Sequence, residues 1–138
     1  MSVADARILE LKPIVDARGH LCVIEGAQQV PFEIKRVYYL YDVPTNSTRG
    51  GHAHRKLHQM LIAVSGRFDV VLDDGRERRR VSLSRPDQGL LIPTMLWREL
   101  ERFSYNGICL VLASEHYDEA DYFREYEAFQ REALANRR

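Results

Sequence analysis

Two histidines separated by a single residue are the groups in this sequence best suited to chemistry. His52 and His54 follow a pair of glycines, and an apolar stretch begins shortly afterwards at Met60. Residues i and i+2 of a β-strand project from the same face. On a strand, the two imidazoles would therefore enter the same space. Imidazole binds metal ions and also exchanges protons near neutral pH, so the pair predicts either a metal site or an acid–base site.

The residues that follow bear on this choice. The spacing from His52 to Gly66 resembles the first motif of cupin barrels, but Gln59 stands where that motif has a glutamate. The segment from Pro93 to Arg98 resembles the second motif, with arginine in place of its histidine. A neutral amide is a poor ligand for a divalent ion, and a protonated guanidinium has no lone pair to donate. The sequence therefore favours acid–base chemistry and predicts no bound metal.

The composition indicates one domain that works without nucleic acid or membrane. The 138 residues suffice for a single core, and 20 basic residues balance 20 acidic ones. We expect no nucleic-acid partner, because no basic stripe is evident. No apolar run approaches the length of a membrane span, and the N-terminus lacks the apolar core of a signal peptide. Cys22 and Cys109 are far apart and are expected to be reduced thiols in a cytoplasmic protein.

Short apolar runs separated by turn residues predict an all-β body. They are rich in Val, Ile, Leu and Tyr, which favour strands, and Asp73-Asp74-Gly75 is a good hairpin turn. This pattern is typical of a β-sandwich or barrel. With no repeat or linker, residues 1–138 are predicted to form one domain. The predicted strands are 21–24, 34–41, 59–64, 68–72, 79–83, 90–92 and 108–112.

The end of the chain changes to a helical pattern. Tyr122, Tyr126 and Phe129 recur every three or four residues, which is the period of an amphipathic helix. Asp118 is a plausible N-cap, and acidic residues follow it in the first turn, where the helix dipole favours them. The sequence therefore predicts a C-terminal α-helix over about 118–134, packed on the barrel or on a second subunit.

Several segments within residues 13–129 carry a more specific pattern. They are 16–19, 34–39, 49–57, 71–75 and 112–122. Together they resemble the dTDP-sugar 3,4-ketoisomerases, also called WxcM-like proteins. The resemblance implies a cupin fold, that is, a double-stranded β-helix or jelly-roll barrel. It also implies a homodimer with exchanged N-terminal strands and no required cofactor.

The resemblance further implies a reaction. These enzymes convert dTDP-4-keto-6-deoxy-D-glucose into a dTDP-3-keto-6-deoxyhexose, on the way to 3-amino-3,6-dideoxy sugars of glycans such as lipopolysaccharide O-antigen or S-layer glycan. A ketone at carbon 4 acidifies the hydrogen on carbon 3, so a base can form an enediolate that is reprotonated at carbon 4. The step needs a base, a nearby acid and donors for the developing oxyanion. It needs no nicotinamide, since no net oxidation occurs.

Three residues are candidates for the proton transfers. The resemblance implies that His52 is the catalytic base. His54 would share its pocket and relay protons or orient the sugar, and the sequence leaves open which of the two is the main base. Tyr38, from the family-like segment 34–39, is expected to supply a proton or hydrogen bond to the keto oxygen. Its neighbour Tyr39 would point away.

Substrate binding is predicted to depend mainly on arginines. Arg36 shares a strand face with Tyr38, and its guanidinium suits a diphosphate, as does that of Arg49. Arg18 lies in the segment that the family places against a neighbouring subunit. Neither it nor the arginine after Trp97 settles the stereochemistry of the product at carbon 4. The candidate binding residues are Arg18, Arg36, Arg49, Lys56, Gln59, Trp97 and Arg98.

Three other functions remain open from the sequence. One is a metal-dependent cupin enzyme, which Gln59 and Arg98 disfavour. A second is a 3,5-epimerase, another cupin that acts on dTDP-keto sugars through a histidine base. The third is a non-catalytic cupin that binds a sugar nucleotide.

Overall fold

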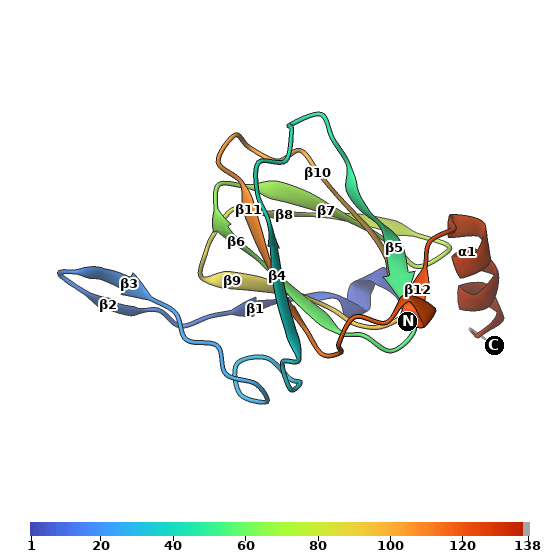
Figure 1. The fold of residues 1–138 in the computed structure, drawn as a ribbon, viewed down its shortest axis with the longest axis horizontal. Coiled ribbons are helices and arrows are strands. Elements are labelled where there is room, and N and C mark those ends of the chain that lie inside the picture. The colour runs from blue at the N-terminus through green and yellow to red at the C-terminus, as the bar shows by residue number, and fades with distance from the viewer. Residues whose placement is uncertain (137–138) are drawn as a thin grey trace.

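The computed structural model describes residues 1–136, and its body consists of two facing antiparallel sheets (Figure 1). The first sheet contains, in order, β1 (Arg7–Glu10), β9 (Gln88–Ile92), β6 (Gln59–Ser65), β11 (Ile108–Ala113) and β4 (Arg36–Leu40). The second contains β12 (Tyr122–Phe123), β5 (Arg49–His54), β10 (Trp97–Glu101), β7 (Phe68–Asp73) and β8 (Arg78–Leu83). A separate hairpin joins β2 (Ile14–Asp16) to β3 (Gly19–Leu21). Short 3-10 helices span Val3–Asp5 (η1) and Glu119–Asp121 (η2), and α1 spans Tyr126–Ala135.

The main core lies between the two sheets. Side chains from β6, β9 and β11 meet side chains from β7, β8 and β10 there, and residues such as Phe68, Leu72 and Phe103 are fully buried. Phe68 and Phe103 stack with ring centroids 5.0 Å apart. Burial of large apolar side chains is the dominant favourable term in folding, so this layer holds the two sheets at a fixed separation. The site described below depends on that separation.

Most of the predicted strands form where the sequence placed them. The runs 34–41, 59–64, 68–72, 79–83, 90–92 and 108–112 coincide with β4, β6, β7, β8, β9 and β11 to within a few residues. The predicted strand at 21–24 is wrong beyond Leu21, because β3 ends there and an extended loop follows. β10 carries Arg98, Glu99 and Glu101, and these charges conceal the apolar pattern of a strand.

The predicted C-terminal helix begins later than residue 118. Asp118 caps the short η2 helix, since its side chain accepts a hydrogen bond from the Ala120 amide at 3.1 Å. Tyr122 then pairs with His54 in strand register, and α1 starts only at Tyr126. The helical spacing that included Tyr122 is therefore misleading, because pairing with the edge of β5 satisfies the backbone of this segment instead.

The helix itself forms a second small core. Phe129 and Ala133 are buried against Trp97, Ala53 and Phe123 of β12. Figure 1 shows α1 beside β5 and β12, at the end of the molecule opposite the β2–β3 hairpin. Within residues 1–136, no helix is long and apolar enough to cross a membrane.

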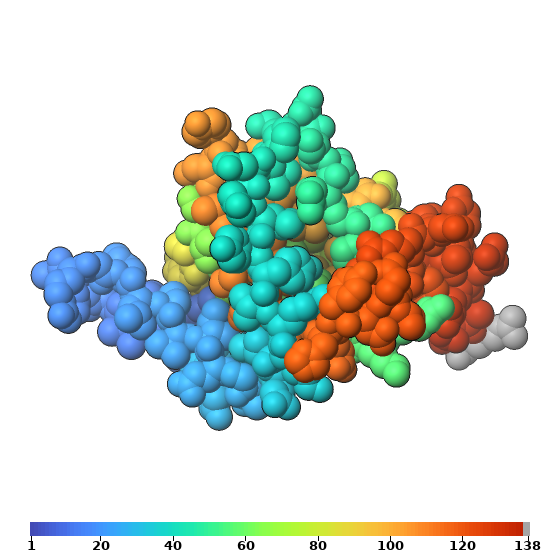
Figure 2. Space-filling model, in the orientation of Figure 1, coloured from blue at the N-terminus to red at the C-terminus, as the bar shows by residue number. Residues whose placement is uncertain are grey.

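The β2–β3 hairpin stands away from the body as an arm, which is also visible in the space-filling view (Figures 1 and 2). Its apolar side chains are largely exposed, with Ile14 at 62%, Val15 at 58% and Leu21 at 55%. A two-stranded hairpin is at best marginally stable alone. We therefore expect the exposed apolar side chains of this arm to pack against another surface.

Candidate active site

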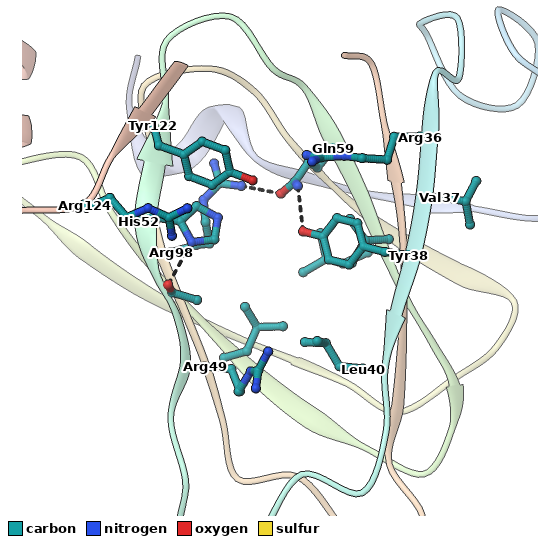
Figure 3. Close-up of a pocket in the computed structure, with 14 residues that line it drawn as sticks. Arg36, Val37, Tyr38, Leu40, Arg49, His52, Gln59, Arg98, Tyr122 and Arg124 are labelled. Atoms are coloured by element: carbon teal, nitrogen blue, oxygen red, sulfur yellow. Dashed lines mark hydrogen bonds between the residues drawn. The ribbon is translucent and has the colours of Figure 1, made fainter. Parts of the chain in front are cut away.

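A cavity of about 390 Å³ opens between the two sheets (Figure 3). Its apolar floor comes from Leu40, Leu61, Leu100 and Val111. Its polar lining consists of Arg36, Tyr38, Arg49, His52, Gln59, Arg98, Tyr122 and Arg124. Four of these are arginines, and none of the lining residues in the described part of the chain is acidic. Such a cavity has the electrostatic character of a site for an anionic ligand.

The two histidines project from the same side of β5, as the sequence predicted. Their ring centroids lie 4.8 Å apart and the rings are nearly perpendicular, at 85°. His54 is completely buried and His52 lines the cavity. The ring of Tyr122 contacts both, with its centroid 5.2 Å from that of His52 and 4.3 Å from that of His54.

The hydrogen bonds of these rings determine which nitrogen is free. The Nδ1 of His52 lies 2.8 Å from the carbonyl oxygen of Gly50. A carbonyl only accepts, so Nδ1 carries the hydrogen in neutral His52 and Nε2 keeps its lone pair. The Nδ1 of His54 lies 3.3 Å from Oδ2 of Asp121. Among the described residues, the buried Nε2 of each ring has no hydrogen-bond partner.

Gly50 supplies that carbonyl through an unusual backbone conformation. Its φ is +95°, a value that L side chains rarely adopt. A Cβ atom there would also lie 3.1 Å from both the carbonyl oxygen of Arg98 and a methyl group of Leu100. Glycine is thus required both by the backbone angle and by the close approach of β10.

Burial and nearby positive charge keep both imidazoles neutral. Burial lowers the pKa of His52 to about 4, and the guanidinium of Arg98 contributes to the shift. Burial together with Arg98 lowers the pKa of His54 to about 2. The contact between His54 and Asp121 is therefore a hydrogen bond donated by a neutral imidazole. At neutral pH both rings are in the state that accepts a proton.

A chain of three hydrogen-bonded side chains runs from Arg98, beside His52, through Gln59 to Tyr38 across the cavity (Figure 3). Nη1 of Arg98 donates to Oε1 of Gln59 at 2.6 Å, and Nε2 of Gln59 donates to the hydroxyl oxygen of Tyr38 at 3.0 Å. Arginine cannot accept a hydrogen bond, so this pairing fixes the orientation of the amide. The hydroxyl of Tyr38 thus accepts from Gln59 and keeps its own hydrogen for a group in the cavity. Burial raises the pKa of Tyr38, which keeps the phenol protonated.

Arg98 is held as a buried cation. It is 1% exposed, and its Nε and Nη2 donate to the carbonyl oxygen of Leu96 at 3.1 and 2.9 Å. Burial lowers its pKa to about 10, which still leaves it protonated at neutral pH. The positions expected of the third and fourth cupin metal ligands therefore hold an amide and a cation that bind each other. This donor set does not fit a divalent metal ion, and within residues 1–136 no cluster of His, Cys, Asp or Glu could hold one.

The other cavity arginines differ in how they are held. Nε and Nη2 of Arg36 are buried and, within the described chain, have no hydrogen-bond partner. Its guanidinium lies 5.4 Å from the ring centroid of Tyr38. Arg124 is exposed, stacks 4.2 Å above the ring centroid of Tyr122, and is ion-paired with Glu119. Arg49 lines the exposed mouth.

Three predicted binding residues lie elsewhere. Trp97 is 5% exposed and packs its ring against Tyr126 and Phe129, on the helix side of the sheet and outside the cavity. Lys56 is exposed and does not line the cavity either. Arg18 sits at the tip of the arm, where its side chain is 91% exposed and pairs with Asp16 at 2.8 Å.

Sequence reasoning missed three residues that the structure brings to the site. Asp121, Tyr122 and Arg124 all belong to the segment that was predicted to be helical. As part of a helix they would have been placed on a different surface. A strand pairing of only two residues has no periodicity that could have revealed it.

The chain matches the family model FdtA, described as WxcM-like, C-terminal, over residues 4–133. It belongs to this family. A curated TDP-4-oxo-6-deoxy-alpha-D-glucose-3,4-oxoisomerase of Aneurinibacillus thermoaerophilus is 42% identical over 91% of this chain and 90% of its own length. These matches confirm the predicted family.

Two solved structures agree in sequence and fold. WlaRB, a TDP-quinovose 3,4-ketoisomerase of Campylobacter jejuni, is 48% identical with a TM-score of 0.89, covering 94% of this chain and 99% of that one. A mutant of QdtA, a 3,4-ketoisomerase of Thermoanaerobacterium thermosaccharolyticum, in complex with TDP-4-keto-6-deoxyglucose, is 40% identical with a TM-score of 0.95, covering 99% of each chain. The predicted cupin fold is confirmed by this likeness.

The epimerase alternative is more distant. A dTDP-4-dehydrorhamnose 3,5-epimerase of Bacillus anthracis matches with a TM-score of 0.74 but only 19% identity, covering 86% of this chain and 77% of that one. This likeness extends to the fold alone.

The orientation of Gln59 leads to a prediction about Tyr38. Replacing Gln59 with glutamate turns a donor into an acceptor, so the carboxylate should take the hydroxyl hydrogen of Tyr38 and oppose its ionisation. We expect Gln59→Glu to raise the pKa of Tyr38 by roughly 1–2 units, because a hydrogen bond to a charged group is worth about 1.5–3 kcal/mol. NMR titration of tyrosine labelled at Cζ, assigned with Tyr38→Phe, measures it.

Gln28→Glu is the matched control, because it adds the same charge at an exposed position outside the cavity. It should leave the Tyr38 titration in place. An unchanged or lowered Tyr38 pKa in Gln59→Glu would mean that the amide does not donate to the phenol.

Proposed function

We propose that the protein is a 3,4-ketoisomerase that converts dTDP-4-keto-6-deoxy-D-glucose into a dTDP-3-keto-6-deoxyhexose. The observation that carries this proposal is the neutral imidazole of His52, with a free Nε2, in the same cavity as the Tyr38 phenol, whose oxygen accepts from Gln59; His54 lies buried beside His52. The relatives named above are 3,4-ketoisomerases or oxoisomerases of TDP-linked sugars. A base and an acid on opposite sides of one cavity match what the reaction requires.

The first half of the reaction is removal of a proton. His52 Nε2 takes the hydrogen from carbon 3 of the sugar, and the electrons of that C–H bond form a double bond to carbon 4. The oxygen on carbon 4 thereby gains negative charge. The hydroxyl of Tyr38 donates to this oxygen, and the fixed charge of Arg98 stabilises it through the low-dielectric interior.

The second half returns a proton to carbon 4. The hydroxyl on carbon 3 loses its proton and becomes the ketone, while the oxygen on carbon 4 gains a proton and becomes the hydroxyl, so atoms and electrons balance without an oxidant. His52, with His54 behind it, carries protons in both halves. The bound substrate also brings negative charge into the cavity, and this charge opposes the effect of Arg98 and raises the basicity of both imidazoles.

The diphosphate is assigned to the arginines at the cavity wall and mouth. Arg36 is the strongest candidate, because two of its buried nitrogens have no partner among the described residues. A guanidinium in that state is stabilised by a phosphate oxygen. Arg49 and Arg124 lie nearer the solvent and would complete the binding of the nucleotide.

We also propose a homodimer in which the N-terminal arms are exchanged. The outer face of β4 exposes Val37 by 54% and Tyr39 by 61%, and Tyr39 borders a second hollow with Tyr41 and Leu110. Exposed apolar patches of this kind mark interaction surfaces. An apolar arm and an apolar face in one chain are complementary if the arm lies on a second copy. Arg18, at the tip of the arm, would then act at the partner's cavity.

The reaction itself is tested by incubating the protein with dTDP-4-keto-6-deoxyglucose in deuterated water and recording NMR spectra. We expect a 3-keto product with solvent deuterium at carbon 4. His52→Asn should lower kcat by roughly 10²–10⁴-fold, the scale of losing a general base, with little change in KM. His116→Asn replaces an exposed histidine and is the control. Binding of the substrate without conversion by the wild type would instead identify a non-catalytic sugar-nucleotide protein.

The assignment of the diphosphate predicts a binding defect. Arg36→Ala should raise KM by roughly 10–150-fold, which corresponds to the loss of about 1.5–3 kcal/mol of charge-assisted hydrogen bonding. Its effect on kcat should be much smaller. Arg76→Ala removes an exposed arginine outside the cavity and should leave KM in place. Equal KM values for Arg36→Ala and wild type would place the diphosphate elsewhere.

The exchanged arm predicts complementation between two inactive variants. In a mixture of Arg18→Ala and His52→Asn, each heterodimer should contain one cavity with both His52 and the partner's arm intact. Activity should therefore return once subunits exchange, which differently tagged chains would report. A fully active monomer, or no recovery after proven exchange, contradicts the proposal.

A further inference from the structure

Asp121 is a buried carboxylate that approaches the catalytic pair from behind. It is 7% exposed, and its Oδ2 lies 3.3 Å from Nδ1 of His54. It comes from η2, in the segment that links β11 to β12. It does not line the cavity, so it does not meet the substrate directly.

One further hydrogen bond holds the carboxylate, and two hold the backbone of Asp121, independently of the histidine. Oδ1 accepts from the backbone amide of Lys56 at 2.7 Å. The backbone carbonyl of Asp121 accepts from the amide of Arg55 at 3.0 Å, and its own amide donates to the carbonyl of Asp118 at 3.0 Å. With Oδ1 held by the Lys56 amide, Oδ2 is the oxygen that faces His54. The orientation of the acceptor is therefore imposed on the imidazole.

We infer that Asp121 is a positioning residue that fixes the tautomer of His54. A carboxylate can only accept, so the hydrogen of neutral His54 is held on Nδ1, and the lone pair of the buried Nε2 is left free. Without this partner the hydrogen is free to sit on Nε2, and His54 can then no longer accept a proton from that side.

The two imidazoles therefore differ in the group that accepts their Nδ1 hydrogen. His52 donates its Nδ1 hydrogen to a neutral carbonyl of its own strand, whereas His54 donates to a carboxylate. When a proton arrives at Nε2, the ring becomes a cation beside Arg98, and within residues 1–136 His54 has an anion, Asp121, in contact to offset that charge, whereas His52 has none. Asp121 therefore offsets part of the cost of a transient positive charge when His54 relays a proton for His52. This step rests on the proposed function, whereas the tautomer does not.

Asp121→Asn gives a sharp test because of the bond to Lys56. Its amide oxygen should keep that hydrogen bond, which turns the NH₂ group toward Nδ1 of His54. The imidazole must then accept at Nδ1 and carry its hydrogen on Nε2. We expect kcat to fall by about 10²-fold or more, as when a triad aspartate is replaced by asparagine and the histidine takes the wrong tautomer. KM should change by less than about threefold, because Asp121 does not line the cavity.

The tautomer is measured directly by ¹⁵N NMR of histidine-labelled protein, with His54→Asn assigning the signal among five histidines. In wild type, His54 should be protonated on Nδ1 and bare on Nε2, and in Asp121→Asn the pattern should reverse. Asp118→Asn is the matched control, since it removes an exposed carboxylate from the same segment and asparagine can still cap Ala120. It should change neither the tautomer nor kcat.

The outcomes separate this inference from the proposed function. Wild-type His54 protonated on Nε2 overturns the inference, even if Asp121→Asn fails to fold. A reversed tautomer with wild-type kcat overturns the role of Asp121 in the reaction. If the wild type does not isomerise the substrate at all, the proposed function fails, and the wild-type spectrum still decides whether Asp121 fixes His54.

Discussion

The buried guanidinium of Arg98 is the interaction on which the cavity depends. A charge removed from water is costly unless nearby groups are arranged to stabilise it. Here the Leu96 carbonyl accepts two of its hydrogen bonds and Gln59 accepts a third. Meeting that demand fixes the Gln59 amide, and the amide in turn leaves the Tyr38 hydroxyl free to donate into the cavity. The same charge helps to keep His52 and His54 neutral. The phenol and the imidazoles that we propose as acid and base thus depend on the same buried charge.

The segment that follows β11 supplies the remaining groups that surround the two histidines. It places the ring of Tyr122 against both imidazoles and the carboxylate of Asp121 behind His54. The two-residue pairing of β12 with β5 holds this segment in register with the histidines. The small core of α1, with Phe129 buried beside Phe123 and Trp97, anchors its far end. Packing remote from the cavity therefore supports the orientation of the groups that line it.

The sequence reveals the parts of this protein that have periodicity or a spaced motif. Strands such as β6 and β7 contain runs of apolar residues, and the His52–His54 spacing assigns both rings to one face. Prediction from the sequence fails where a residue's environment is formed by residues far away in the chain. Trp97 belongs to the helix core because α1 packs there, and the family-like spacing around it contained no sign of that contact. Asp121 and Tyr122 had the spacing and composition of a helix start, yet hydrogen bonds to β5 and its following turn override local propensity.

The replacement of a metal ligand by arginine explains why the histidines are suited to moving protons. In a metal-binding cupin the lone pair of each ligand histidine is committed to the ion, so the ring is not available as a base. In this chain the cation at the corresponding place carries only hydrogen-bond donors, and it binds Gln59 and a carbonyl instead of the imidazoles. The positive potential of the site is thereby retained while both Nε2 atoms remain free. A fixed guanidinium also has no exchangeable coordination position, so the geometry that faces the substrate is set by the fold alone. The same barrel face can therefore support proton transfer between adjacent carbons because its charge is covalently part of the chain.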